Sequence, residues 1–125
     1  MNGNSVFIDT NIVLYLLNGD SEVAKLLQRK TIYISIISEI ELLGYKGILE
    51  SEKNVIQNFL NQCVIINITQ SIKEKVIELK STYAIKLPDA LIAATAIIHD
   101  LHLITADKGF EKIKDLKLSL YTPKG

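Results

Sequence analysis

Four acidic residues of this 125-residue chain stand beside predicted strand-to-helix junctions: Asp9, Glu41, Asp89 and Asp107. Carboxylates are hard oxygen ligands, and in proteins they suit Mg²⁺ or Mn²⁺. Such an ion retains waters and open positions for a substrate phosphate, and it can polarise a phosphodiester and activate a water. With one cysteine and two histidines in the chain, these residue types favour phosphate chemistry over a zinc site.

The elements that would position these acids are short β-branched runs that alternate with longer helical patterns. The predicted strands are Ser5–Ile8, Thr31–Ile36, Val64–Ile68, Leu101–Thr105 and Leu118–Tyr121. The predicted helices are Ile12–Leu17, Ser21–Arg29, Ser38–Leu43, Glu50–Asn61, Ser71–Tyr83 and Leu87–His99, with a short one at Lys108–Ile113. This alternation, with nearly continuous apolar strands, is typical of a parallel sheet covered on both faces. We therefore predict an α/β fold, a single three-layer α/β/α domain over residues 1–125 with a mainly parallel sheet of four to five strands.

A parallel sheet would bring the acids to one edge. Asp9 and Asp107 follow strands, and Glu41 is expected in the first turn of the helix after the second strand. All three should share the carboxyl edge, where open α/β sheets bind their ligands. Asp89 should join them, because its helix feeds directly into the next strand and must begin at that edge. Asp100 precedes a strand and should lie on the opposite edge.

Each acid also has a structural explanation. Asp9 and Asp107 are good helix N-caps, and Ser38 with Glu41 has the form of a capping box. Asp89 would complement a helix dipole. Taken singly, each explanation is favoured over a catalytic one. Four carboxylates in one cleft nevertheless repel one another, so some must protonate unless a cation binds, and together they favour a functional site.

Composition narrows the class of protein. Fourteen basic and fourteen acidic residues give a net charge of zero, which argues against nucleic-acid binding by bulk charge. Cys63 is the only cysteine, so an intramolecular disulfide is excluded. The longest uncharged apolar stretch, Ala90–Ile98, is too short to span a bilayer, and no signal peptide is recognisable. We predict a cytoplasmic protein with no membrane partner.

Four motifs of the chain, in order, resemble those of PIN domains, most closely the compact VapC-type toxins of toxin–antitoxin pairs. They are Val6-Phe7-Ile8-Asp9-Thr10-Asn11, Ser38-Glu39-Ile40-Glu41-Leu42-Leu43-Gly44, Leu87-Pro88-Asp89-Ala90-Leu91-Ile92-Ala93-Ala94 and Leu103-Ile104-Thr105-Ala106-Asp107-Lys108-Gly109-Phe110. The resemblance covers essentially the whole chain.

The resemblance implies a metal-dependent ribonuclease that uses Mg²⁺ or Mn²⁺. Its acidic cluster would be Asp9, Glu41, Asp89 and Asp107, supported by the polar residues Asn11 and Thr105. We expect Asp9 and Asp107 to ligate directly, and Glu41 or Asp89 to act through water or to help deprotonate the nucleophile. The resemblance also implies cleavage of single-stranded or structured RNA, a homodimer and a cognate antitoxin that blocks the site.

Three alternatives stay open. The chain could be an RNA-processing nuclease that is not a toxin, or a non-catalytic binding domain with a PIN-like fold. A phosphatase with Asp9 as nucleophile is disfavoured, because the haloacid-dehalogenase type needs an acid two residues later and this chain has Asn11. Lysines such as Lys86 are interpreted as a solvated helix face, and His99 and His102 as structural.

Overall fold

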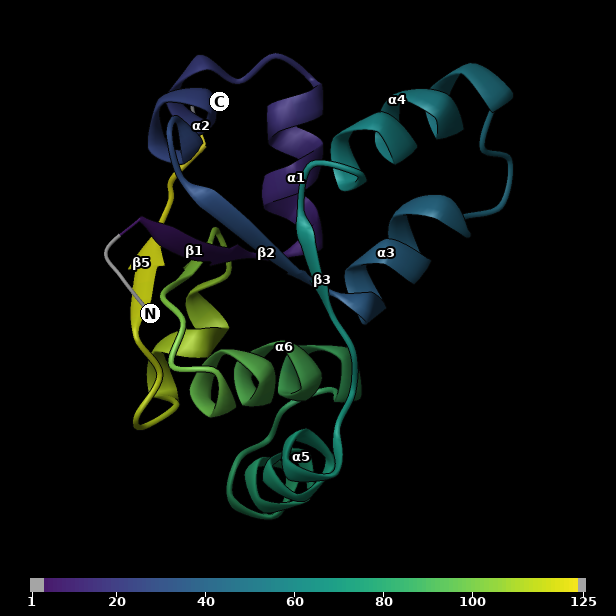
Figure 1. Cartoon of the computed structure of the whole chain (residues 1–125). Helices are drawn as coiled ribbons and strands as arrows, with labels where there is room; N and C mark the ends of the chain where they lie inside the picture. The colour runs from purple at the N-terminus through teal and green to yellow at the C-terminus, as the bar shows by residue number, and fades with distance from the viewer. Residues whose placement is uncertain (1–3, 124–125) are drawn as a thin grey trace.

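The computed structural model describes residues 4–123, and within them five strands form one sheet in the order β3-β2-β1-β4-β5 (Figure 1). Every neighbouring pair is parallel. The strands are β1 (Ser5–Ile8), β2 (Thr31–Ser35), β3 (Val64–Ile66), β4 (Leu103–Thr105) and β5 (Leu118–Leu120). The sheet therefore has five strands, the upper of the two predicted numbers, and is wholly parallel.

Helices cover both faces of the sheet, as predicted. One face carries α1 (Thr10–Leu17), α2 (Ser21–Leu27), α3 (Ile36–Leu43) and α4 (Glu50–Leu60). The other carries α5 (Gln70–Thr82), α6 (Leu87–Ile98) and the short 3₁₀ helix η1 (Lys108–Lys112). The predicted α/β/α sandwich is confirmed. No helix among the described residues is long and apolar enough to cross a membrane.

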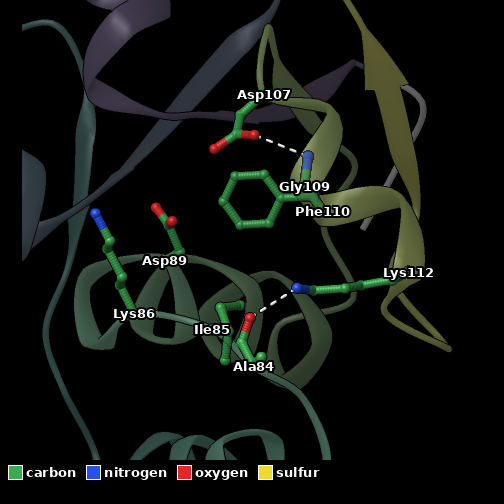
Figure 2. Close-up of a pocket in the computed structure, with 8 residues that line it drawn as sticks. All are labelled: Ala84, Ile85, Lys86, Asp89, Asp107, Gly109, Phe110 and Lys112. Atoms are coloured by element: carbon green, nitrogen blue, oxygen red, sulfur yellow. Dashed lines mark hydrogen bonds between the residues drawn. The ribbon is translucent and has the colours of Figure 1, made fainter.

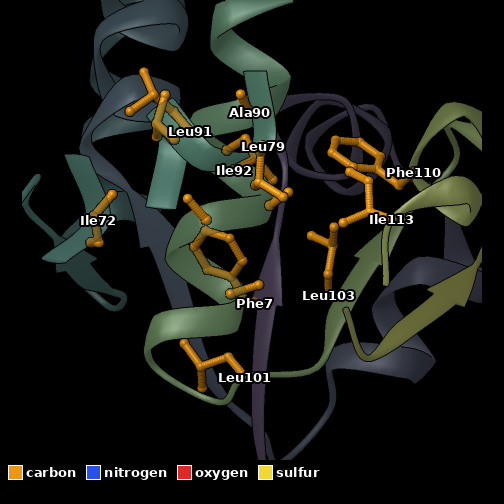
Figure 3. Packing of buried hydrophobic residues seen from close by; sticks show 14 of the residues in the cluster. Phe7, Ile72, Leu79, Ala90, Leu91, Ile92, Leu101, Leu103, Phe110 and Ile113 are labelled. Atoms are coloured by element: carbon orange, nitrogen blue, oxygen red, sulfur yellow. The ribbon is translucent and has the colours of Figure 1, made fainter. Parts of the chain in front are cut away.

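The alternation of side chains along β1 divides the core in two. Val6 and Ile8 face the cluster under α1–α4, whereas Phe7 faces the cluster under α5 and α6. Helix α6 is buried from Ala90 to Ala96 because it lies between the sheet and α5 (Figures 1 and 3). Its apolar character on all sides is thus explained by core packing.

Helix α3 departs from the sequence-based expectation. It begins at Ile36 rather than Ser38, and its N-cap is Ser35, whose hydroxyl accepts a hydrogen bond from the Ile37 amide at 3.1 Å. The predicted Ser38 capping box is therefore wrong, and Glu41 lies in the second turn of the helix rather than the first. Ser38 is fully buried and turned toward α1, where its hydroxyl lies 2.9 Å from that of Thr10.

The edge of the sheet opposite the acids also matches the prediction. Asp100 lies in the turn between α6 and β4, and its carboxylate forms a salt bridge of 2.6 Å with Lys117, just before β5. Nearby, His102 and Ser119 share a hydrogen bond of 2.6 Å between Nε2 and Oγ. Asp100 is thus separated from the other acids.

Candidate active site

Asp9 is fixed in orientation at the end of the central strand β1. One carboxylate oxygen, Oδ1, accepts from the Ile12 amide at 3.1 Å and caps α1. The other, Oδ2, accepts from the hydroxyl of Thr105, the last residue of β4. Thr105 is fully buried and also accepts from the Asp107 amide at 3.1 Å. One hydroxyl therefore connects two of the predicted acids.

Glu41 reaches the same region from α3. Its side chain is exposed, and its Oε1 accepts from the Thr10 hydroxyl at 2.7 Å. The same hydroxyl lies 2.9 Å from Ser38 Oγ. Thr10 directly follows Asp9, so this contact ties the Glu41 carboxylate to the first turn of α1. Neither Thr10 nor this contact of Ser38 could be recognised from the sequence, because α1 and α3 meet only in the folded chain.

Asp107 and Asp89 approach from the other face of the sheet. Asp107 caps η1, because its Oδ1 accepts from the Gly109 amide at 2.8 Å. Asp89 lies in the first turn of α6, directly after Pro88. Helix α6 leads into β4, so it begins at the carboxyl edge of the sheet, as the sequence analysis required.

The four acids meet around one cavity of about 190 Å³. Its walls are formed by nine residues from α1, α3, α6 and the segment after β4: Asp9, Thr10, Asn11, Glu41, Pro88, Asp89, Ile92, Asp107 and Phe110. Asn11 thus lies at the site, as predicted. Thr105 is not in the wall but behind it, where it supports Asp9.

The electrostatics of the cavity follow from this concentration of carboxylates. Burial raises the pKa of Asp9, and the negative charges of Asp107 and Asp89 raise it further, against the hydrogen bonds from Thr105 and Ile12. The pKa of Asp89 is likewise raised by burial and by the negative charges of Asp107 and Glu41. The positive charges of Lys86 and Lys112 act in the opposite direction and lower it. A positive charge in the cavity would offset the repulsion between these carboxylates.

The residues fit a hard divalent cation as a donor set. Within residues 4–123 no three His, Cys, Asp or Glu side chains converge closely enough to hold one ion together. Mg²⁺ does not need them to, because it commonly keeps several waters and binds through one or two carboxylates plus substrate phosphate oxygens. The carboxylates around the cavity suit that mode of binding.

A second, larger cavity of about 300 Å³ adjoins the first (Figure 2). The two share three wall residues, Asp89, Asp107 and Phe110. The rest of the wall comes from the α5–α6 connection and η1: Ala84, Ile85, Lys86, Gly109 and Lys112. Lys86 is therefore a wall residue beside Asp89 and not only part of a solvated helix face. No sequence signal marked this cavity, because it forms between segments that are far apart in the chain.

Known proteins share this fold and identify its family. Residues 6–116 match the PIN domain family, so the chain belongs to that family. PIN domains are generally nucleases. No curated protein sequence matches the chain significantly.

Solved structures are similar over nearly the whole chain. A toxin–antitoxin complex from Klebsiella pneumoniae contains a chain with 34% identity and a TM-score of 0.81, with 94% of this chain and 99% of that chain covered. VapBC2 from Rickettsia felis, bound to a DNA fragment from its promoter, is 27% identical with a TM-score of 0.80, and the match covers 94% of this chain and 98% of that chain. FitAcB from Neisseria gonorrhoeae is 26% identical with a TM-score of 0.73, and the match covers 90% of this chain and 95% of that chain.

Proposed function

We propose that this chain is a metal-dependent endoribonuclease that hydrolyses RNA phosphodiester bonds and acts as the toxin of a toxin–antitoxin pair. The observation that carries the proposal is the cavity where four carboxylates from four separate segments meet, two of them with raised pKa values. Membership of a family of nucleases supports hydrolysis of a nucleic acid.

In this proposal Asp9 and Asp107 hold Mg²⁺ or Mn²⁺. When bound, the ion supplies Lewis acidity and countercharge at the reacting phosphate. Thr105 fixes the Asp9 carboxylate through Oδ2, and the Ile12 amide fixes it through Oδ1. An orientation held by two donors needs no rearrangement when substrate binds, and this preorganisation is a source of catalytic rate.

Glu41 or Asp89 is proposed to take the proton from the attacking water. Glu41 suits this role because its carboxylate is exposed to the cavity and held in place by Thr10. Asp89 suits it because its raised pKa makes it a stronger base than an ordinary aspartate. Asn11 completes the polar wall, where its amide can orient a water or a phosphate oxygen.

The toxin role rests on the similar structures, which are described as toxin–antitoxin complexes. By the same likeness we propose a cognate antitoxin that blocks the cavity, a homodimer and a cytoplasmic location. Light scattering of the purified protein tests the dimer.

The first experiment is cleavage of a mixed RNA pool by purified protein with Mg²⁺, Mn²⁺ or EDTA. Asp9→Asn should abolish cleavage, whereas Asp100→Asn, at the opposite edge of the sheet, should leave it intact. Absence of cleavage with either metal, from folded protein free of antitoxin, would favour a non-catalytic binding domain.

A second experiment separates a toxin from an RNA-processing nuclease. Expression of the chain alone should arrest growth, and Asp9→Asn should relieve the arrest. A protein that cleaves RNA in vitro without arresting growth would be a processing nuclease instead.

A further inference from the structure

The second cavity, lined by the α5–α6 connection and η1, has the features of a nucleotide subsite. Its volume of about 300 Å³ lies at the lower end of ligand pockets, roughly 300–1,000 Å³, so it suits one nucleotide rather than a longer segment. It opens into the acidic cavity through the shared wall of Asp89, Asp107 and Phe110. Whatever it holds is therefore next to the reacting phosphate.

The wall of this cavity combines apolar and cationic groups. Ile85 and the Phe110 side chain, which is 3% exposed, give it an apolar part. Lys86 and Lys112 give it two positive charges at different sides of the cavity (Figure 2). A nucleotide has the same two components, an apolar base or sugar face and an anionic phosphate.

The two lysines have different surroundings. The Lys112 ammonium donates to the Ala84 carbonyl at 2.7 Å and so links η1 to the α5–α6 connection, fixing the separation of two walls. Lys86 is exposed and extends beside Asp89, and it forms no salt bridge with any described residue (Figure 2). Its ammonium is therefore available to an incoming anion.

The charge of the chain makes such a cation necessary. The net charge is zero, and the acidic cavity itself repels a polyanion. Lysine in the adjoining cavity supplies attraction where the backbone must enter. In a duplex the bases are stacked within the double helix and cannot enter a recessed cavity. A cavity of this size therefore admits only a nucleotide that is splayed out from a single strand.

We propose that this cavity binds the nucleotide next to the scissile phosphate of a single-stranded RNA. Lys86 contacts a backbone phosphate, and the wall of Ile85 and Phe110 packs against the sugar or base. The proposal rests on the proposed function for the position of the scissile bond, and it adds a place for one neighbouring nucleotide and the residues that contact it.

The test is binding of a short randomised single-stranded RNA, measured by fluorescence anisotropy in the Asp9→Asn background so that cleavage does not interfere. Lys86→Gln should weaken binding about fivefold, the upper range for one exposed ion pair. It should also reduce the slope of log Kd against log salt by about 0.7, the value for one phosphate contact with a single strand.

Ala84→Phe tests the cavity itself, because it places a ring at the cavity wall and leaves the carbonyl that Lys112 uses. It should weaken binding without changing the salt slope, and Ala84→Leu repeats the test if the larger residue impairs folding. Lys25→Gln, on α2 at the opposite face of the sheet, is the matched control and should change neither quantity.

The outcomes separate this proposal from the proposed function. If the parent chain cleaves RNA but Lys86→Gln and Ala84→Phe bind like Lys25→Gln, the subsite is wrong and the nuclease stands. If Lys86→Gln lowers only kcat, Lys86 acts on Asp89 alone, and the subsite is again wrong. Weakened binding in both variants of a chain that does not cleave would support nucleotide binding in this cavity and overturn both the nuclease and the position given to the scissile bond.

Discussion

The substitution Thr105→Val removes the hydroxyl that connects Asp9 and Asp107 and keeps the shape of the side chain. Thr105 is fully buried at the end of β4, so no water takes the place of its hydroxyl. Two hydrogen bonds disappear: the one donated to Asp9 Oδ2, and the one accepted from the Asp107 amide at 3.1 Å.

The expected loss of stability follows from the type of each bond. A hydrogen bond to a charged group contributes about 1.5–3 kcal/mol, and a neutral one about 0.5–1.5 kcal/mol. The Asp107 amide is only partly buried and can bond to water, so its loss is at the low end. We expect Thr105→Val to lower the free energy of unfolding by about 2–3.5 kcal/mol at neutral pH, a large part of the 5–15 kcal/mol typical of a domain.

The loss should depend on pH in a defined direction. The Thr105 hydroxyl lowers the pKa of Asp9, so its removal raises a pKa that burial already raises. Below both pKa values Asp9 is protonated, and only a neutral hydrogen bond of about 1 kcal/mol is missing. The penalty should grow as the pH rises through the pKa of Asp9 in the native protein and then through the higher pKa in the variant.

Urea denaturation with EDTA at several pH values measures this penalty. Thr95→Val is the matched control, because Thr95 is 1% exposed but its hydroxyl donates to the Leu91 carbonyl of its own helix at 2.7 Å. Its penalty should be about 1 kcal/mol or less and the same at every pH. A Thr105→Val penalty below about 0.5 kcal/mol, or one that does not change with pH, would refute the role given to this hydroxyl.

Three further predictions concern the acids. Burial and neighbouring carboxylates raise the pKa of Asp9, so its negative charge destabilises the fold at neutral pH. Asp9→Asn should therefore raise the Tm by about 2–5 °C in metal-free calorimetry. Asp100→Asn should not raise the Tm, because the salt bridge with Lys117 lowers the pKa of Asp100. Thr10→Val should reduce kcat for RNA cleavage about tenfold, the equivalent of one charge-assisted hydrogen bond to Glu41, and unchanged kinetics would contradict that role. The affinity for Mg²⁺ in titration calorimetry should fall as the pH is lowered toward the raised pKa of Asp9, and a constant affinity would count against Asp9 as a ligand.

The positions of Asp9 and Asp107 could be predicted from the order of residues alone. Both follow strands, and in a parallel sheet all strands end at one edge, so adjacency in the sequence determines their position in space. Asp89 needed one more step, since the direction of α6 is set by the strand that follows it. These inferences use topology, which the alternation of strands and helices specifies strongly.

The role of Ser38 could not be predicted in this way. Ser35 and Ser38 are both plausible N-caps, and the run Ile34–Ile37 reads as strand because three of its residues are β-branched. Both serines are buried, and their partners distinguish them: Ser35 accepts from the Ile37 amide as N-cap, whereas Ser38 lies beside Thr10, a partner that only the tertiary structure provides. The position of Lys86 in a cavity wall could not be predicted either, because the rest of that wall includes residues of η1, which are distant in the sequence.

The bond between Thr105 and Asp9 joins residues 96 positions apart, and this separation has a consequence for synthesis of the chain. In the described sheet no strand pair is a hairpin, and β1 lies between β2 and β4, so β1 gains its second neighbour only after β4 has left the ribosome. Until then Asp9 has only the Ile12 amide of the two donors that orient it, and the part of the cavity wall that includes Asp107 is missing. The cavity to which we assign the proposed activity is therefore completed only late in translation, when β4 and the segment after it are available to the sheet.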